Sequence, residues 1–208
     1  MKKSLLLLSL IIGLGLFASA QENKEYRTLF GRDGDIDHGA YGAMTFSFGS
    51  VDGKDAFMTG IKGGWVIDHR LTLGLAGSGF TSDLRFDNKF PGQRVNLVGG
   101  YGGLLIEPVV MPFSPVHLTF PVIIGAGGVA YVNYDWWNYD SQVDPSVWDS
   151  DAFFVLEPGV EIEINMVRFM RLAIGASYRY TSSLVMNNTN GNVLRGFSGG
   201  FSLKFGKF

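Results

Sequence analysis

The chain has 208 residues, including 29 glycines and no cysteine, and its formal net charge is -2 at pH 7. Hydrophobic residues make up 46% and aromatic residues 14% of the chain, which excludes a disordered protein. The lack of cysteine excludes a disulfide framework, a thiolate metal site and a cysteine nucleophile, and the charge gives no reason to expect nucleic acid as a partner.

Residues 1–20 have the pattern of a secretory signal peptide. Lys2 and Lys3 form a positive start, an apolar run follows, and Ala18-Ser19-Ala20 matches the small-residue cleavage pattern. A transmembrane helical anchor is disfavoured because the run is short and ends in that motif. We therefore expect an exported chain cut before Gln21, with residues 21–38 as a periplasmic lead.

Beyond the lead, apolar and polar residues alternate with a period of two, which indicates β-strands. Turn residues such as Asp52-Gly53 and Asp68-His69 separate them. No later stretch offers the ~20 apolar residues that a membrane helix needs. We expect eight strands, near residues 39–49, 55–67, 70–81, 94–107, 116–133, 153–164, 168–181 and 196–206.

The connections between these predicted strands alternate in length, apart from a short first one. Those after the second, fourth and sixth strands are short, whereas the others span residues 82–93, 134–152 and 182–195. Short turns at one end, long loops at the other and an even strand number are typical of bacterial outer-membrane barrels. The predicted fold class is all-β: an eight-stranded antiparallel up-and-down transmembrane β-barrel over residues 39–208.

The two faces of the predicted strands differ in polarity. In the sixth strand, Phe154 and Ile162 share one face, and Glu157 and Glu163 share the other. A secreted or periplasmic β-sandwich or lipocalin-like barrel would bury the apolar face, whereas a membrane barrel would turn it to lipid. Aromatic residues near the strand ends and the unequal loop lengths favour the membrane arrangement.

The signal peptide, the amphipathic strands and the segment GFSGGFSLKFGKF together resemble the small outer-membrane β-barrel proteins of Gram-negative bacteria, the OmpA/OmpX-type scaffold. The stretches GIKGGWVIDHRLTLGLAGSGF and GRDGDIDHGAYGA are more similar to uncharacterised barrel proteins of the Bacteroidota. The resemblance covers residues 39–208. It implies an outer-membrane location with both chain ends in the periplasm. The implied partners are outer-membrane lipids, lipopolysaccharide and the barrel-assembly machinery.

The end of the last predicted strand departs from the family pattern. In the family, the final aromatic residue is in phase with the lipid-facing side chains. Here Phe208 is in phase with Lys204, whereas Phe205 is in phase with the apolar set. The strand therefore ends near Phe205, or a bulge shifts its frame.

An eight-stranded barrel has an interior only wide enough for side chains to fill it. The charged residues predicted there carry both signs, and burying one unpaired would cost several kcal/mol. The turn after the sixth strand places Arg171 opposite Glu161 or Glu163. We therefore predict a structural salt-bridge network, with a narrow ion or proton path as the alternative, formed by Lys62, Glu157, Glu161, Glu163, Arg171, Arg179 and Lys204.

The predicted loop over residues 134–152 combines aromatic and acidic residues and has no lysine or arginine. Exposed aromatic residues can anchor a protein or glycan partner, and clustered carboxylates can share divalent cations. Alternatively, the tryptophans lie in the membrane interface and the aspartates are only hydrated. The candidate surface-binding residues are Trp136, Trp137, Tyr139 and Trp148. By contrast, residues 186–192 read as a flexible polar tip.

A lipid A-modifying enzyme on this scaffold would need a nucleophile or base at the extracellular rim. The histidines, His38, His69 and His117, are predicted near the periplasmic turns, away from rim serines such as Ser78 and Ser182. The spaced aspartates at residues 33–37 match the calcium-binding EF-hand pattern poorly.

We therefore expect a monomer without catalysis, cofactor or metal. Its expected role is structural or surface-interacting, in the manner of an adhesin. A small porin or selective channel is the alternative, and a lipid A-modifying enzyme comes third.

Overall fold

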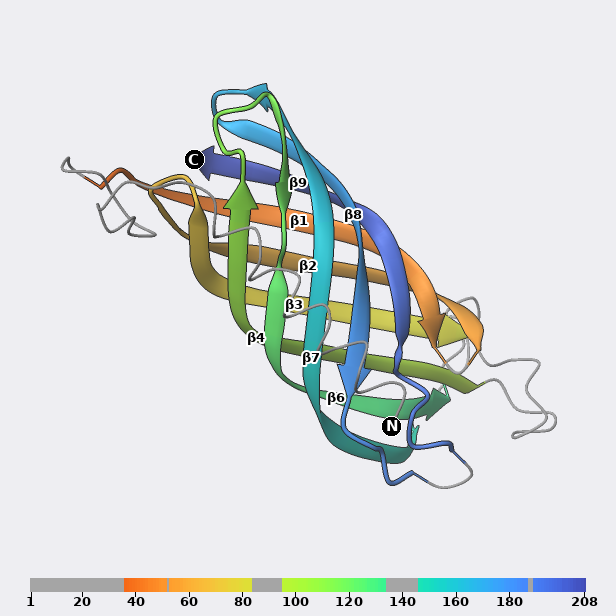
Figure 1. The fold of residues 1–208 in the computed structure, drawn as a ribbon. Coiled ribbons are helices and arrows are strands. Elements are labelled where there is room, and N and C mark those ends of the chain that lie inside the picture. The colour runs from red at the N-terminus through yellow and green to blue at the C-terminus, as the bar shows by residue number, and fades with distance from the viewer. Residues whose placement is uncertain (1–35, 52, 84–94, 134–145, 187–188) are drawn as a thin grey trace, which may run out of the picture. The chain divides into compact units, whose positions relative to one another are not determined.

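The computed structural model describes residues 36–51, 53–83, 95–133, 146–186 and 189–208. No helix in those ranges is long and apolar enough to cross a membrane. The expected signal peptide and most of the expected lead lie outside the described residues. The strands (Figure 1) are β1 (His38–Val51), β2 (Lys54–Ile67), β3 (Leu71–Asp83), β4 (Val95–Val110), β5 (Val116–Thr119), β6 (Val122–Asn133), β7 (Ser146–Val167), β8 (Met170–Thr181) and β9 (Gly196–Lys207).

The described strands close into an antiparallel ring. β1 pairs with both β2 and β9, so that Met44 lies opposite Ile61 on one side and Leu203 on the other. β3 pairs with β4, and β5 and β6 together occupy one position between β4 and β7. The ring therefore has eight positions, and the predicted eight-stranded antiparallel barrel is confirmed.

One predicted strand, residues 116–133, is interrupted at Phe120–Pro121. Pro121 has no N–H group and cannot donate to a neighbouring strand. The interruption keeps its place in the wall because the Phe120 N–H donates to the Pro108 carbonyl and the Gly159 N–H donates to the Pro121 carbonyl. β5 and β6 therefore act as one broken strand.

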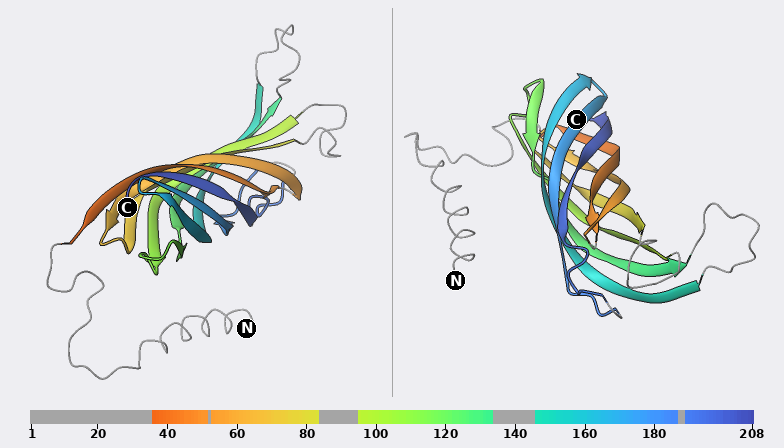
Figure 2. Two further views of the ribbon diagram at one scale, coloured as in Figure 1. Left: turned by 90° about the horizontal axis from the view of Figure 1, so that it is seen from above. Right: turned by 90° about the vertical axis from the view of Figure 1, so that its right-hand side faces the viewer.

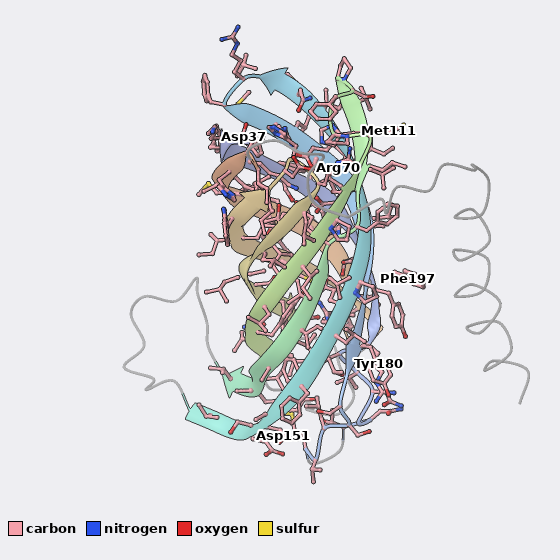
Figure 3. The ribbon with its side chains drawn as sticks, turned by 60° about the vertical axis from the view of Figure 1, so that its left-hand side comes forward. Asp37, Arg70, Met111, Asp151, Tyr180 and Phe197 are labelled. Carbon is pink, nitrogen blue, oxygen red and sulfur yellow. The ribbon has the colours of Figure 1, made fainter. Side chains whose placement is uncertain are left out.

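The two ends of the barrel differ in their connections. At the end that we call the turn end, the β2–β3 connection is a tight turn in which Asp68 and His69 have φ of 51° and 56°. The Arg70 N–H closes it by donating to the Ile67 carbonyl at 3.0 Å, as in the type I′ turns that fit twisted hairpins. The longer connections leave the opposite, loop end. Figure 3 shows Asp37, Arg70 and Met111 at the turn end and Asp151 at the loop end.

β7 is longer than the sequence predicted. It begins at Ser146 rather than near residue 153, and its first residues pair with β6, with Asp149 opposite Tyr131. Residues 146–152, expected in a loop, are therefore strand. The β6–β7 hairpin extends past the end of β8, because Val155 is the first β7 residue paired with β8 (Figure 2).

The apolar face of the strands points outward. Ile61, Leu75 and Phe154 are 68%, 66% and 76% exposed, whereas the side chains of Glu163 and Lys204 are almost completely buried. Tyr180 and Phe197 also project from the outer wall (Figure 3). A soluble barrel would have the reverse arrangement. The predicted outward orientation of the apolar set is confirmed, and the polar set faces the interior.

Glycine is abundant because the wall of the barrel is crowded on its inner side. A Cβ atom on the inward-facing Gly74 would collide with the Gly63 carbonyl of the neighbouring strand. The outward-facing Gly42 has open space around it. The inward glycines therefore permit the close strand approach that a narrow barrel needs.

Candidate functional site

The turn-end half of the interior contains a network of ion pairs centred on Lys204 of β9. The Lys204 Nζ donates to Glu107 Oε1 at 2.7 Å and to Glu163 Oε2 at 3.2 Å. It also lies 3.5 Å from Glu161 Oε2. The Lys204 side chain is fully buried, so these carboxylates replace the water that would otherwise solvate its charge.

A second lysine joins the same carboxylates from β2. The Lys62 Nζ donates to Glu161 Oε1 at 2.7 Å and to Glu107 Oε2 at 3.3 Å. Glu107 also accepts a hydrogen bond of 3.0 Å from the Tyr41 hydroxyl. Each oxygen of the Glu107 carboxylate therefore has a cationic partner, which is what a buried carboxylate requires.

The network ends in a cap at the turn end. The Arg171 Nη1 donates to Glu163 Oε1 at 3.4 Å, and the buried His117 places its Nε2 3.6 Å from Glu163 Oε2. The Phe208 ring covers both Arg171 and Tyr41. The Arg171 Cζ lies 3.9 Å from the Phe208 ring centroid, and the ring centroids of Tyr41 and Phe208 lie 5.7 Å apart. These contacts show how the last strand ends and which way its aromatic residues face. The strand ends at Lys207, Phe205 faces outward, and Phe208 turns inward onto the network.

The predicted register of Arg171 is wrong. Arg171 lies opposite Asn165, not opposite Glu161 or Glu163, because β7 continues to Val167 and the turn lies at residues 168–169 instead of 165–167. Arg171 contacts Glu163 diagonally instead, two positions further along β7.

Two members of the network were missed from the sequence. Glu107 follows the apolar, inward-facing residues Tyr101 and Leu105 on β4, so its strand shows no polar face. His117 lies in β5, within the predicted strand over residues 116–133, but the prediction did not count it among the interior residues. A strict period-two count from Tyr101 and from Thr119 would have placed both side chains inside.

Glu157 faces inward as predicted but forms no ion pair with another described residue. Its carboxylate accepts hydrogen bonds from the Tyr101 hydroxyl and, at 2.6 Å, from the Ser177 hydroxyl. A cavity of about 100 Å³ lies between Glu157 and Tyr101 on one side and Lys62 and Glu161 on the other. This space separates Glu157 from the lysines, which is why the predicted membership of Glu157 in the network is wrong.

Arg179 is also inward and fully buried, but it too lies outside the network. Its Nε donates to the Leu194 carbonyl at 2.7 Å, and its Nη1 donates to the Met58 Sδ at 3.0 Å. Its Cζ lies 5.5 Å from the Phe80 ring centroid. The predicted salt bridge is replaced by these neutral partners because Arg179 points toward the loop end.

Apolar side chains fill that loop-end half. The residues that follow β8 fold inward, and we call residues 182–186 and 189–195 the plug segment. The Thr189 hydroxyl of this segment lies 2.7 Å from the Tyr131 hydroxyl. The Val185 N–H donates a hydrogen bond of 2.5 Å to Asp151 Oδ2. The expected polar tip therefore belongs to a segment whose apolar residues pack inside, namely Leu184, Met186, Val193 and Leu194.

The candidate surface-binding residues are not placed. Trp136, Trp137 and Tyr139 lie outside the described residues, as does the side chain of Trp148, although its backbone belongs to β7.

The histidines lie in turn-end segments, and His69 Nε2 is 3.3 Å from Asp37 Oδ2. Within the described ranges, no group of histidine, aspartate and glutamate side chains is arranged to hold a metal ion.

No protein-family model and no curated protein sequence matches the chain. Among solved structures, it is similar to Neisserial surface protein A (NspA), with a TM-score of 0.51 and 14% identity over 84% of this chain and 100% of that one. Weaker similarity extends to Ail of Yersinia pestis, solved with the heparin analogue sucrose octasulfate (TM-score 0.42, 13% identity, 83% and 99% coverage). It extends also to the outer-membrane protease OmpT of Escherichia coli (0.28, 9%, 83% and 95%). The likeness to NspA shows that the chain has the fold of the small outer-membrane β-barrels.

Proposed function

We propose that this chain is a monomeric outer-membrane β-barrel protein with a structural or surface-interaction role and a closed interior. The observation that carries the proposal is an outward apolar wall around a bore that is filled at both of its ends. The fold shared with NspA, which is named as a surface protein, supports the location.

The closed interior rests on three successive barriers. Phe208 and Arg171 cover the turn end, and the lysine–glutamate network lies behind them. Beyond the cavity of about 100 Å³, the plug segment and the apolar cluster fill the loop end. An eight-stranded barrel leaves no room for a wide aqueous path around such side chains.

Planar-bilayer recording of the purified protein tests this closed interior. We expect no stable unit conductance at any voltage that the bilayer tolerates. A reproducible unit conductance would overturn the closed barrel in favour of the small selective channel.

Attachment to a surface or partner is assigned to the long connections at the loop end, because loops on a rigid scaffold commonly carry binding. The segment at residues 134–145 contains Trp136, Trp137 and Tyr139. We expect deletion of residues 136–144 to abolish attachment to host-type surfaces while the barrel still folds. Deletion of residues 86–92 in the β3–β4 connection is the matched control, and equal attachment by both variants would contradict the assignment.

The proposed topology has residues 1–20 removed on export and both ends of the barrel chain in the periplasm. Protease added to intact cells is expected to cut within residues 134–145 and to leave the turn end uncut. Cleavage at the β2–β3 turn instead would reverse the orientation.

Catalysis is not part of the proposed role. His69 and His117 lie at the turn end, whereas Ser82 lies at the loop-end margin of β3, so the described histidines and this rim serine are on opposite ends. Incubation with lipid A is expected to leave the acyl mass unchanged. A change in mass would establish the lipid-modifying alternative.

A further inference from the structure

Glu157 and Arg179 face each other across β7 and β8 without forming an ion pair. Leu156 lies opposite Tyr180 and Gly159 opposite Ser177, and this register brackets Glu157 opposite Arg179. Both side chains are buried in the interior. Opposite charges in directly facing positions normally attract each other.

The two side chains both approach Tyr101, with the Arg179 Cζ 5.8 Å from its ring centroid, but they use different partners. Glu157 turns to the cavity, where the hydroxyls of Tyr101 and Ser177 donate to it. Arg179 turns to the loop end and uses its Nε on the Leu194 carbonyl of the plug segment. Its Nη2 is buried and has no hydrogen-bond partner.

The present partners of Arg179 are weaker than its facing carboxylate would be. A carbonyl oxygen and a thioether are neutral acceptors, whereas hydrogen bonds between two charged groups are roughly twice as strong. A guanidinium held away from its counter-charge in an apolar surrounding is destabilised. This arrangement is maintained by the packing of Leu184, Val193 and Leu194 rather than by Arg179 itself.

We propose that the plug segment is a displaceable closure and that Arg179 exchanges between two partners. With the plug segment in place, Arg179 binds the Leu194 carbonyl. When the plug segment leaves, the guanidinium turns to the Glu157 carboxylate and their ion pair stabilises the displaced state.

Displacement would open the cavity toward the loop end. The wall of that cavity carries hydroxyl groups from Tyr101, Ser177, Ser198 and Ser202. The network around Lys204 lies on its other side and makes no contact with the plug segment in the ion pairs of the described residues. The displaced state is therefore a polar pocket reached from the loop end, and not a pore, which goes beyond the closed state proposed above.

The experiment uses the absence of native cysteine. Leu194→Cys places a single thiol at a fully buried position, while the carbonyl that Arg179 binds remains. Its reaction rate with a membrane-impermeant maleimide, measured on the full barrel in lipid vesicles, reports displacement of the plug segment. Val185→Cys is the matched control, since Val185 is 87% exposed in the same segment.

Two second substitutions separate the exchange from simple packing. Arg179→Met is expected to lower the Leu194→Cys labelling rate several-fold, because the ion pair that stabilises the displaced state is lost together with the weaker hydrogen bond to the Leu194 carbonyl. Glu157→Gln is expected to lower it several-fold. Its amide oxygen can still accept from Tyr101 and Ser177, but the charge that stabilises the displaced state is gone.

The outcome with Glu157→Gln decides the proposal. An unchanged or faster rate in that variant would overturn the exchange, because a merely structural Arg179 predicts no decrease. Labelling of Leu194→Cys as fast as Val185→Cys would also overturn it, since the plug segment would not be closed at all. Circular dichroism verifies that each variant folds. Because bilayer conductance is measured separately, failure here leaves the non-conducting barrel standing.

Discussion

The turn-end half of the interior is filled by charges contributed by several strands, whereas the loop-end half is filled by apolar side chains and the plug segment. In the first, Lys204 and Lys62 each join carboxylates from β4 and β7. In the second, Leu194, Phe80 and Leu97 pack together, and one cation, Arg179, has only neutral partners. The same narrow bore is thus closed by strand-borne ion pairs at one end and by an inserted connection at the other.

The difference has a physical consequence for what each half can do. A buried carboxylate stripped of its cation is strongly destabilised, so the network is stable only when complete. Apolar contacts are not directional and can be exchanged for others at a smaller cost. The turn end is therefore suited to a permanent seal and the loop end to a seal that can be displaced.

The largest effect is expected from Lys204→Met, which removes a cation from the buried carboxylates of Glu107 and Glu163 and from the partly buried Glu161. The free energy of unfolding should fall by about 3–5 kcal/mol, as when one partner of a buried pair is removed. Urea unfolding in detergent or lipid measures it. Lys207→Met, on the exposed end of the same strand, is the matched control. Equal effects of the two substitutions would contradict the network as a source of stability.

A smaller loss is expected from Leu194→Ala at the other end. Removing a fully buried leucine side chain typically costs about 2–5 kcal/mol, and the lower part of that range applies where a connection can collapse into the space. Val185→Ala is the control, because the Val185 side chain is exposed. The same unfolding assay applies, and a loss in the control as large as in Leu194→Ala would show that the plug segment is not packed.

The independence of the two halves gives a third prediction. The cavity separates them, and Lys204 and Leu194 share no partner in the described contacts. The effects of Lys204→Met and Leu194→Ala on the unfolding free energy should therefore add within about 0.5 kcal/mol. A larger coupling in the double variant would mean that the interior behaves as one unit.

The smallest effect lies outside the bore, at Asp37. The Lys207 ammonium donates a hydrogen bond of 2.8 Å to this carboxylate and holds the pKa of Asp37 below its usual value of 3.8. Since the folded-state pKa is lowered, the contribution of this pair is present above the unfolded pKa and is lost as pH falls through the lowered one. Lys207→Met should return the pKa toward 3.8 in an NMR titration. An unchanged pKa would exclude the contact in solution.

Much of the wall follows from the sequence, because a strand exposed to lipid on one side and packed on the other alternates strictly. The faces of β8 and β9 were predicted correctly down to Arg179 and Lys204. Prediction failed where alternation carries no information. Glu107 follows apolar inward residues, and the plug segment has no period because it is neither strand nor helix.

Partner choice was harder to predict than direction. Arg171, Glu157 and Arg179 were all correctly placed inside. Which groups they contact depends on where the β7–β8 turn lies and on an inserted connection, neither of which the alternation of polar and apolar residues reveals. A one-residue change of register alters every cross-strand partner.

The pairing of β1 with β9 has a consequence for the kinetics of folding. It joins Ala40 to Lys207, so the ring closes only when the first and last strands meet, and such distant contacts form slowly. Because Lys204 belongs to β9, Glu107 and Glu163 gain their central cation only when the ring closes. Closure of the seam and neutralisation of the network are then a single step. Lys204→Met should accordingly slow refolding as well as speed unfolding.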